Sequence, residues 1–361
     1  MKYNIDRQSH TPAYLQLYLQ VRDEIIKGIY PAGSKLPSKR TVALDSNTST
    51  ITVEHAYALL CDEGYIEARE RSGYFVIFHA DAGFISAPAA KTTHRENPDV
   101  RTDANTDFPF SVLAKTMRKV ISEAGSEILD RSPNLGTIEL RDAIRLYLAQ
   151  NRGILVDSNQ IVIGSGSEHL YTLLIKLLGR NRTYAIESPS YKMIEEVYIA
   201  SDVKLEKLPL SPDGIDSTAL KNATSDILHI TPYRSFPSGV TATASKRHEY
   251  LKWAEIGARY IIEDDFESEF SVSRKPEETL FSHSPKDNVI YMNTFSKTIS
   301  PSFRVGYMVL PKTLATEYEA KLGFYNCTVP TYLQLVLAEL INNGDFERHI
   351  NRVRRIKRKN I

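Results

Sequence analysis

The sequence predicts two different folds in one chain: an N-terminal winged helix-turn-helix (α+β) over residues 1–78 and an α/β domain over residues 106–361. Three observations lead to this prediction. Helix-like segments and a hairpin fill the first part, residues 79–105 have no hydrophobic periodicity, and strand-like runs then alternate with helix-like runs. A chain of 361 residues is also longer than one typical hydrophobic core requires.

The N-terminal part reads as helix, turn, helix and hairpin. A first helix is expected over residues 12–28, where apolar residues recur at helical spacing and Gly28 can end it. Ser38 is a candidate N-cap for a short helix, and the polar turn "SNTST" separates this helix from the next, which ends near Gly64. The run "YIEARERSGYFVIF" alternates around Gly73 and predicts the hairpin.

Residues 79–105 contain Ala, Pro and polar side chains without periodicity, which is typical of a linker. After this segment, the alternation of strands and helices predicts a largely parallel sheet. The expected strands are "QIVIG", "TYAIE", "VKLEKLPL", "DILHIT", "RYIIED", "NVIYMN" and "RVGYMVL". Open sheets of this class usually bind ligands outside the carboxyl ends of their strands, so motifs at these ends are candidate site residues.

The composition is that of an ordinary soluble protein, with 42% hydrophobic and 25% charged residues. No apolar run approaches the length of a membrane span, and "MKYNIDRQSH" lacks the apolar core of a signal peptide. Cys61 and Cys327 lie far apart without a CxxC spacing, so neither a metal site nor a disulfide framework is predicted. We therefore expect a cytoplasmic protein that makes no membrane contact. The formal net charge of +1 does not identify a partner.

Two motifs at strand ends could hold a planar phosphorylated group. In "IGSGSEHLYTLL" a Gly-Ser-Gly-Ser turn opens a helix, and the free backbone N–H groups there can bind a phosphate. This is not a dinucleotide fingerprint, because His169 stands where that motif needs a glycine. In "ESPSYKM" Tyr191 can stack on a planar ring, although a core tyrosine is the more common role.

Two further motifs carry an acid and a lysine. The doublet in "YIIEDDFESEF" can keep a pyridine nitrogen protonated, although a solvated acidic loop would be the usual explanation of this motif alone. In "NTFSKTISPSFRVGYMVLP", Lys297 is either a solvated surface lysine or the amine that forms a Schiff base with an aldehyde. Thr294, Ser296 and Arg304 around it are the hydroxyls and guanidinium expected near a phosphate.

The N-terminal part resembles the GntR family of bacterial regulators through "GSKLPSKRTVA" and "TVEHAYALLCDEGYIEARERSGYFV". The resemblance spans residues 12–77 and implies binding to double-stranded DNA, with one helix crossing the backbone and the next facing base edges. The hydroxyl-rich start "TSTIT" replaces an arginine that the family often has. Protein contact is the alternative use of such a module. The candidate DNA contacts are Ser38, Lys39, Arg40, Ser49, Thr50, Thr52 and, beside the wing tip, Arg71.

The four motifs, in this order and spacing, resemble the fold type I enzymes that use pyridoxal 5'-phosphate (PLP), the aspartate aminotransferase superfamily. Joined to a GntR-like part, they resemble the MocR subfamily of regulators over essentially the whole chain. The resemblance implies that Lys297 forms the Schiff base and that Asp264, rather than Asp265, pairs with the pyridine nitrogen. The other implied cofactor contacts are Gly166, Ser167, Glu168, Tyr191, Thr294, Ser296, Arg304 and, for the neighbouring subunit's phosphate, Arg131.

The chain departs from the superfamily at several of its positions. Phe266 stands where the family commonly has a tyrosine, Met193 where some members carry an arginine, and Phe236 where aminotransferases have an asparagine. The chain stops at "RHINRVRRIKRKNI", so we expect the smaller C-terminal subdomain of the family to be missing or truncated. The basic residues of this last stretch could contact nucleic acid, but an exposed helix face is the more common explanation.

These features predict a transcription regulator in which an amine or amino-acid effector, or PLP itself, acts at the Lys297 aldimine to alter DNA binding. We expect a head-to-tail homodimer, as the resemblance implies. A second hypothesis is an active aminotransferase that carries a DNA-binding module, although Phe266, Met193 and the short C-terminus favour sensing over turnover. A third is a domain that binds no cofactor and only dimerises.

Overall fold

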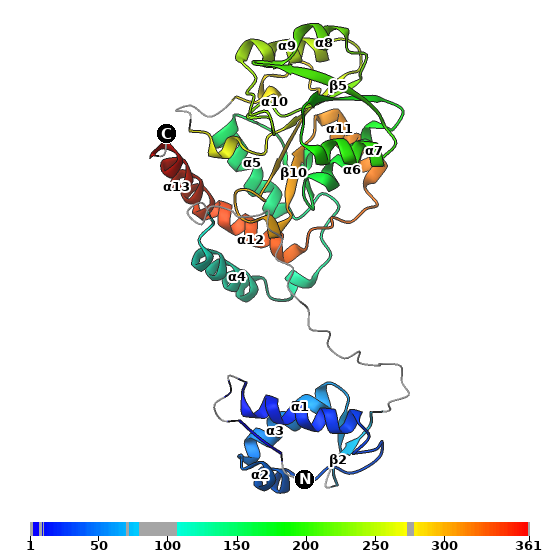
Figure 1. Cartoon of the computed structure of the whole chain (residues 1–361), viewed down its shortest axis with the longest axis vertical. Coiled ribbons are helices and arrows are strands. Elements are labelled where there is room, and N and C mark those ends of the chain that lie inside the picture. The colour runs from blue at the N-terminus through cyan, green and yellow to red at the C-terminus, as the bar shows by residue number, and fades with distance from the viewer. Residues whose placement is uncertain are drawn as a thin grey trace. The chain divides into compact units, whose positions relative to one another are not determined.

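The computed structural model describes residues 3–6, 9, 11–69, 72–78, 107–272 and 278–359. The chain divides into two compact units, Met1–Asn97 and Pro98–Ile361 (Figure 1). The linker predicted for residues 79–105 and the wing residue Arg71 lie outside the described residues. No described helix is both long and apolar enough to cross a membrane.

The smaller unit has the predicted order of helices and hairpin. Its elements are α1 (Ala13–Ile26), α2 (Lys39–Ser46), α3 (Thr50–Asp62), β1 (Ile66–Arg69) and β2 (Gly73–Val76). The apolar residues of α3 are buried on one face, with Val53 and Tyr57 packed against Leu17 and Val21 of α1 in one core. The strands pair antiparallel, and the positive φ of +107° at Gly73 explains the glycine beside the turn.

The larger unit is built on one eight-stranded sheet in the order β3-β10-β9-β8-β7-β4-β5-β6. Neighbouring strands from β9 through β8, β7 and β4 to β5 run parallel, whereas β10 is antiparallel to both β3 and β9. The largely parallel sheet is therefore confirmed. The strands are β3 (Ile161–Gly164), β4 (Thr183–Ser188), β5 (Lys204–Ser211), β6 (Gly214–Ile215), β7 (Ile227–Ile230), β8 (Tyr260–Asp264), β9 (Val289–Thr294) and β10 (Gly306–Val309).

Helices cover both faces of this sheet because its strands are apolar on both sides. Alternate residues of β10 pack in different cores. Tyr307 packs in the core that includes residues of α5 (Ile138–Arg152) and α12 (Thr331–Asn342). Met308 packs in the core that includes residues of α6 (Ser167–Leu178), α7 (Lys192–Ala200) and α11 (Lys312–Leu322). The α-helices are α4 (Phe110–Ala124), α5 (Ile138–Arg152), α6 (Ser167–Leu178), α7 (Lys192–Ala200), α8 (Ser217–Asn222), α9 (Ala244–Ala254), α10 (Leu280–His283), α11 (Lys312–Leu322), α12 (Thr331–Asn342) and α13 (Asp345–Lys359). Short 3-10 turns are η1 (Gly125–Leu129), η2 (Ser158–Gln160), η3 (Ser268–Phe270) and η4 (Pro301–Phe303).

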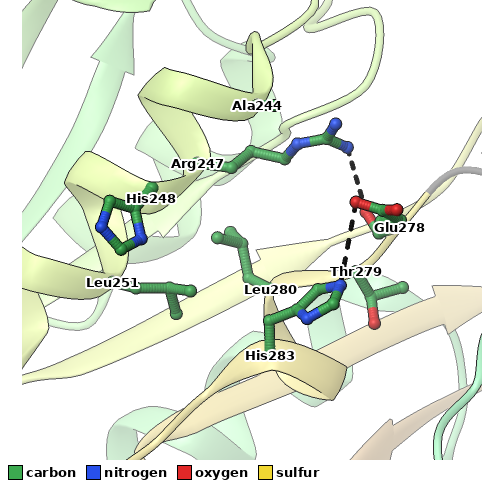
Figure 2. A pocket seen from close by; sticks show the side chains of 8 residues that line it. All are labelled: Ala244, Arg247, His248, Leu251, Glu278, Thr279, Leu280 and His283. Atoms are coloured by element: carbon green, nitrogen blue, oxygen red, sulfur yellow. Dashed lines mark hydrogen bonds and ion pairs between the residues drawn. The ribbon is translucent and has the colours of Figure 1, made fainter.

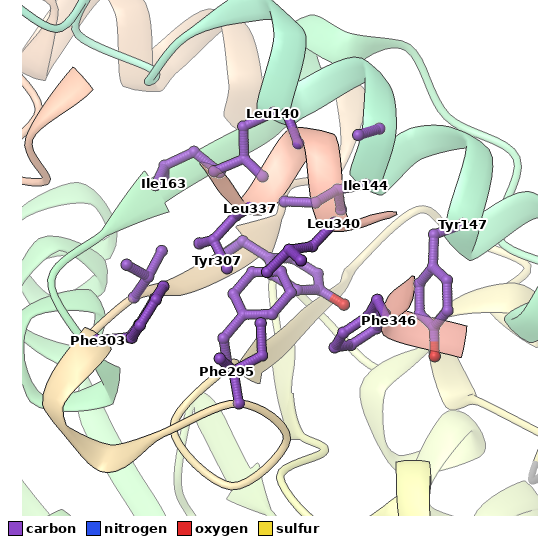
Figure 3. Packing of buried hydrophobic residues seen from close by; sticks show 14 of the residues in the cluster. Leu140, Ile144, Tyr147, Ile163, Phe295, Phe303, Tyr307, Leu337, Leu340 and Phe346 are labelled. Atoms are coloured by element: carbon purple, nitrogen blue, oxygen red, sulfur yellow. The ribbon is translucent and has the colours of Figure 1, made fainter. Parts of the chain in front are cut away.

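The core beneath α5 and α12 supports the loops that follow β9 (Figure 3). Phe295, one residue after the end of β9, packs its ring against Tyr307 of β10 and Phe346 of α13, with ring centroids 5.7 Å apart in both pairs. Aromatic pairs at this separation add to the stabilisation that burial of their surface provides. The segment that carries Lys297 is therefore fixed to the sheet on the side away from solvent.

Candidate functional site

A cavity of about 510 Å³ opens at the carboxyl ends of the parallel strands. It is bounded by the start of α6, the start of α7 and the loops that follow β7, β8 and β9. Its lining residues are Ser167, Glu168, Tyr171, Tyr191, Ile194, Thr231, Phe236, Asp264, Phe266, Thr294, Ser296, Lys297 and Arg304. Most side chains that the sequence places around a cofactor thus share one cavity, although they come from four separate segments of the chain.

Two of the predicted contacts do not line the cavity. Gly166 is the N-cap of α6, and its φ of +88° is one that residues with a side chain rarely adopt. A Cβ atom at this position would lie 3.0 Å from the Arg304 guanidinium, so the glycine leaves space between the helix and that arginine. Arg131 is exposed in the loop before α5. Its predicted contact is with the phosphate of a neighbouring subunit, which a single chain does not test.

The start of α6 and Arg304 both line the cavity and could bind an anion there. The first N–H groups of α6 carry the positive end of the helix dipole, and the side chain of Ser167 adds a hydroxyl. Arg304 forms an ion pair of 2.6 Å with the Glu168 carboxylate. That carboxylate would compete with a bound phosphate for the guanidinium, so Glu168 can serve an anion through its backbone N–H rather than its side chain.

Asp264 also lines the cavity and is 4% exposed. The Tyr171 hydroxyl donates a hydrogen bond to its carboxylate, and His229 Nε2 lies 3.5 Å from its Oδ2 atom. The second ring nitrogen of His229 is 2.7 Å from the Tyr198 hydroxyl. Burial and the charge of Asp264 raise the pKa of Tyr171 well above its ordinary value, so Tyr171 remains a donor.

Asp265 points away from this cavity. Its carboxylate accepts a hydrogen bond of 2.8 Å from Tyr291 and lies 3.7 Å from the guanidinium of Arg152. Arg152 also forms an ion pair of 2.9 Å with Glu269 in the same buried polar cluster. Of the two acids that the sequence offers, Asp264 is therefore the one that can reach a ligand in the cavity.

Lys297 lies at the mouth of the cavity, with 42% of its side chain exposed. Its Nζ atom forms a 2.8 Å ion pair with Glu267 Oε1 and lies 4.1 Å from the centroid of the Phe266 ring. Phe266 thus gives this amine an apolar neighbour, and Glu267 gives it a counter-ion.

Sequence reasoning missed Tyr171, His229 and Glu267. Tyr171 lies one helical turn after Ser167, so the i, i+4 spacing places both on the same face of α6. That signal was available in the motif. His229 lies inside an apolar strand, and only the pairing of β7 with β8 brings its ring to Asp264.

A second, smaller cavity of about 310 Å³ lies between α9 and α10 (Figure 2). Arg247 Nη1 donates a 3.1 Å hydrogen bond to the backbone oxygen of Glu278, and His283 Nε2 lies 3.8 Å from the Glu278 carboxylate. Arg247 and His283 both have Glu278 as their partner, and the lining of this cavity contains none of the predicted site residues.

The smaller unit has a groove of about 480 Å³ between α2 and the start of α3, with Arg40 and Thr50 among its lining residues. The predicted cap is present, because the Ser38 side chain accepts from the Thr41 backbone N–H. The Ser49 side chain likewise accepts from the backbone N–H of Thr52. Lys39 forms an ion pair of 3.0 Å with Glu54. Arg40 is exposed, which is the geometry that a phosphate contact requires.

Comparison with known families separates the chain in the same way. Residues 99–360 match the family of class I and II aminotransferases, and residues 13–76 match the gntR family of bacterial regulatory proteins. The uncharacterized HTH-type transcriptional regulator YdeL of Bacillus subtilis is 34% identical over 98% of this chain and 79% of its own length. The HTH-type pyridoxine biosynthesis transcriptional regulator PdxR of Corynebacterium glutamicum is 28% identical over 97% of this chain and 78% of its own length.

A third relative is the probable rhizopine catabolism regulatory protein MocR of Rhizobium meliloti, which is 27% identical over 98% of this chain and 76% of its own length. Among solved structures, the α-aminoadipate aminotransferase LysN of Thermus thermophilus is 25% identical, with a TM-score of 0.62 over 70% of this chain. The kynurenine aminotransferase of Pyrococcus horikoshii is 24% identical, with a TM-score of 0.62 over 69% of this chain. The chain spans 65% and 64% of these two aminotransferase chains.

Proposed function

This chain belongs to the class I and II aminotransferase family and, through its N-terminal part, to the gntR family, and we propose that it is a MocR-type transcription regulator that binds DNA and PLP. The observation that carries this proposal is the cavity in which Lys297, Asp264 and Arg304 meet, in a chain that also has a winged helix-turn-helix. An amine, a buried acid and an anion-binding helix start are the three groups that an aldehyde-bearing pyridine phosphate requires.

The residues of the cavity fit this cofactor. The space left by Gly166 beside Arg304 suits a phosphate, and the buried Asp264 faces the cavity with a hydroxyl donor behind it. His229 Nε2 is buried beside Asp264 and has no hydrogen-bond partner among the described residues. PLP would supply an aldehyde that condenses with an amine and a ring that withdraws electrons.

Each group of the chain would have a separate task. The start of α6, Ser167, Thr294, Ser296 and Arg304 would bind the phosphate, and Tyr191 would contact the ring. The Asp264 carboxylate would hold a proton on the ring nitrogen, while the hydroxyl of Tyr171 keeps that carboxylate in place. Lys297 would supply the amine, and Phe266 would limit its access to water.

We expect a visible absorption band when PLP is added to the purified protein, and we expect this band to be absent from Lys297→Ala. Lys192→Ala, which removes an exposed lysine of the nearby α7 with 84% side-chain exposure, should keep the band. If native protein gives no band with excess PLP, the cofactor proposal fails. Before PLP is added, fluorescence of Trp253, the only tryptophan, should be the same in all three proteins and so report an intact larger unit.

DNA binding is the second half of the proposal. We expect Arg40→Ala to weaken binding to every DNA sequence at low salt, because its exposed guanidinium is placed to neutralise a phosphate. The slope of log affinity against log salt should become shallower by about 1. Arg22→Ala is the matched control, because Arg22 lies on α1 and pairs with Asp23 at 2.8 Å. Equal slopes in the native protein and Arg40→Ala would remove Arg40 from the interface.

We further propose a cytoplasmic homodimer in which an amine or amino-acid effector, or PLP itself, changes the DNA-bound arrangement. An active aminotransferase with a DNA-binding module is the second candidate, because the cavity retains both Lys297 and Asp264. Incubation of the PLP-loaded protein with amino acids separates the two. A keto product indicates turnover, and a band shift without keto product indicates sensing.

A further inference from the structure

Helix α3 of the smaller unit turns one face to the core and the opposite face to solvent. The residues of the first face are Val53, Ala56, Tyr57 and Leu60. The residues of the second face follow one another at helical spacing and form a continuous stripe, which we call the outer face of α3. They are Thr50, Ile51, Glu54, His55 and Ala58. The second helix of a helix-turn-helix lies in the major groove of DNA, and only its outer face can contact the bases there.

Several polar side chains of α3 near its start already have partners within the smaller unit. The hydroxyls of Ser49 and Thr52 lie 2.9 Å apart, and that of Ser49 also caps the helix. Glu54 forms a 3.0 Å ion pair with a lysine at the start of α2. The ring of His55 packs edge-on against that of Tyr14 in α1, with ring centroids 6.0 Å apart. These contacts leave the apolar side chain between them as the next candidate for base readout.

That side chain is Ile51, which is 64% exposed and does not belong to the hydrophobic core of the smaller unit. Single exposed apolar residues are common on protein surfaces and do not by themselves indicate a site. The position of Ile51 distinguishes it, because it is the second residue of the helix that is predicted to face base edges. Packing within the unit gives no reason for an isoleucine at this position, whereas contact with an apolar group of the DNA does.

The backbone around Ile51 and its own side chain are both well fixed. The Ser49 cap holds the first turn of α3, and the hydroxyl of Tyr57 donates a 2.9 Å hydrogen bond to the backbone oxygen of Pro37, just before α2. Ile51 therefore has a fixed position relative to Arg40, the candidate phosphate contact on α2. In a helix a β-branched side chain keeps one strongly preferred rotamer, so it loses little conformational freedom when it contacts a ligand.

The base edges of the major groove carry one apolar group, the C5 methyl of thymine, and otherwise hydrogen-bond donors and acceptors. An isoleucine against those polar groups would displace water without replacing its hydrogen bonds. We propose that Ile51 contacts the C5 methyl of a thymine and so selects a T·A base pair at one position of the DNA site. This inference rests on the DNA-binding half of the proposed function. It adds an apolar base contact to the hydroxyl and cationic contacts that the sequence predicts.

The test replaces thymine by deoxyuridine, which lacks only the C5 methyl. The full chain first selects a preferred duplex from a pool of short duplexes with a randomised centre, and each thymine of that duplex is then replaced singly. We expect at least one thymine at which deoxyuridine weakens binding of native protein about fourfold, as the loss of one buried methyl group implies. Ile51→Ala should bind the same two duplexes equally to within about 1.5-fold, because the contact partner of the methyl is gone.

Ile26→Ala is the matched control, because Ile26 is 36% exposed on α1, and it should keep the native response to deoxyuridine. Alanine is a better helix former than isoleucine, so α3 should remain folded in Ile51→Ala.

Three results would overturn the inference: no thymine whose replacement weakens binding of native protein, the same loss in Ile51→Ala as in native protein, or salt-dependent binding without any enriched sequence. A native protein that binds no duplex even at low salt would instead refute the DNA-binding half of the proposed function, so the two failures are distinguishable.

Discussion

Asp264 and Asp265 are adjacent in the chain but serve different surroundings. Successive side chains of a strand point to opposite faces, so Asp264 meets Tyr171 of α6 while Asp265 meets Tyr291 and Arg152 on the other face. One acid is available to a ligand, and the other is part of a buried polar cluster. The two aspartates differ in their surroundings because they are one residue apart at the end of the strand, not because their side chains differ.

Glu187, at the end of β4, is a buried acid whose titration can be measured. Burial raises its pKa from 4.5 to about 7, against hydrogen bonds from Ser235 and the Thr231 backbone that lower it. Between these two pH values the folded protein holds a proton that the unfolded chain has lost. Stability therefore falls as the pH rises through this window, because the folded state must release that proton.

We predict that Glu187→Gln removes this pH dependence. A rise in pKa from 4.5 to about 7 corresponds to about 3 kcal/mol of unfolding free energy lost by native protein between pH 5 and 8. Glutamine keeps an acceptor for Ser235 and does not titrate. Over this pH range the variant should therefore lose about 3 kcal/mol less unfolding free energy than native protein. Urea unfolding followed by Trp253 fluorescence measures the difference. Glu196→Gln, at an exposed pair, should keep the native profile, and a native profile in Glu187→Gln would contradict the assignment.

At the scale of elements, α3, the helix predicted to face base edges, depends on its first residues in two ways. The Ser49 side chain caps the helix by accepting from the Thr52 N–H at 3.0 Å, and its hydroxyl lies 2.9 Å from that of Thr52. These hydroxyls were predicted to face base edges. They also hold the first turn of the helix, so a loss of DNA binding on their removal has two possible causes.

Two substitutions at Ser49 separate these causes. Ser49→Ala removes the cap and should cost about 1 kcal/mol, which makes the amides of the first turns of α3 exchange about fivefold faster. Ser49→Asp keeps the cap, so exchange should remain native while the new charge repels phosphates and weakens DNA binding. Hydrogen exchange of peptides from residues 50–62 and a DNA-binding titration measure the two effects. Native DNA affinity in Ser49→Asp would show that Ser49 lies away from the DNA.

At the scale of the whole larger unit, one buried arginine joins helix and sheet. Arg152 at the end of α5 is 1% exposed in its side chain and lies 2.9 Å from Glu269 and 3.7 Å from Asp265. Tyr147 of the same helix donates a 2.7 Å hydrogen bond to Glu269. The cluster thus connects α5 with the segment that follows Asp264, and the acid of the cavity is held in place from behind.

We predict that Arg152→Met lowers the unfolding free energy by about 3–5 kcal/mol, because it leaves two buried carboxylates without a counter-charge. The midpoint of urea unfolding, followed by Trp253 fluorescence, should fall accordingly. Arg145→Met is the matched control on the same helix. Arg145 pairs with Asp142 at 3.2 Å, and the two side chains are 38% and 45% exposed, so the cost should be below about 1 kcal/mol. Equal midpoints for the two variants would contradict a structural role for the cluster.

Local pattern was sufficient to predict the elements and most of the cavity. The cap at Ser38 and the strand end at Asp264 follow from short-range periodicity and capping chemistry. Parallel strands bring their carboxyl ends to one edge, so motifs far apart in the chain were expected to meet there.

The tertiary structure decided which side chains touch. His229 lies beside Asp264 because β7 pairs with β8, and Lys297 lies 2.8 Å from Glu267 because the loops after β8 and β9 converge. No local signal carries such contacts, since they depend on strand order and on the packing of distant segments. The sequence by itself therefore determined the chemistry available to this protein: a lysine, an acid and a phosphate site in the same chain as a DNA-binding unit. Folding decided which charges surround that lysine, and with them the ligands that it can receive.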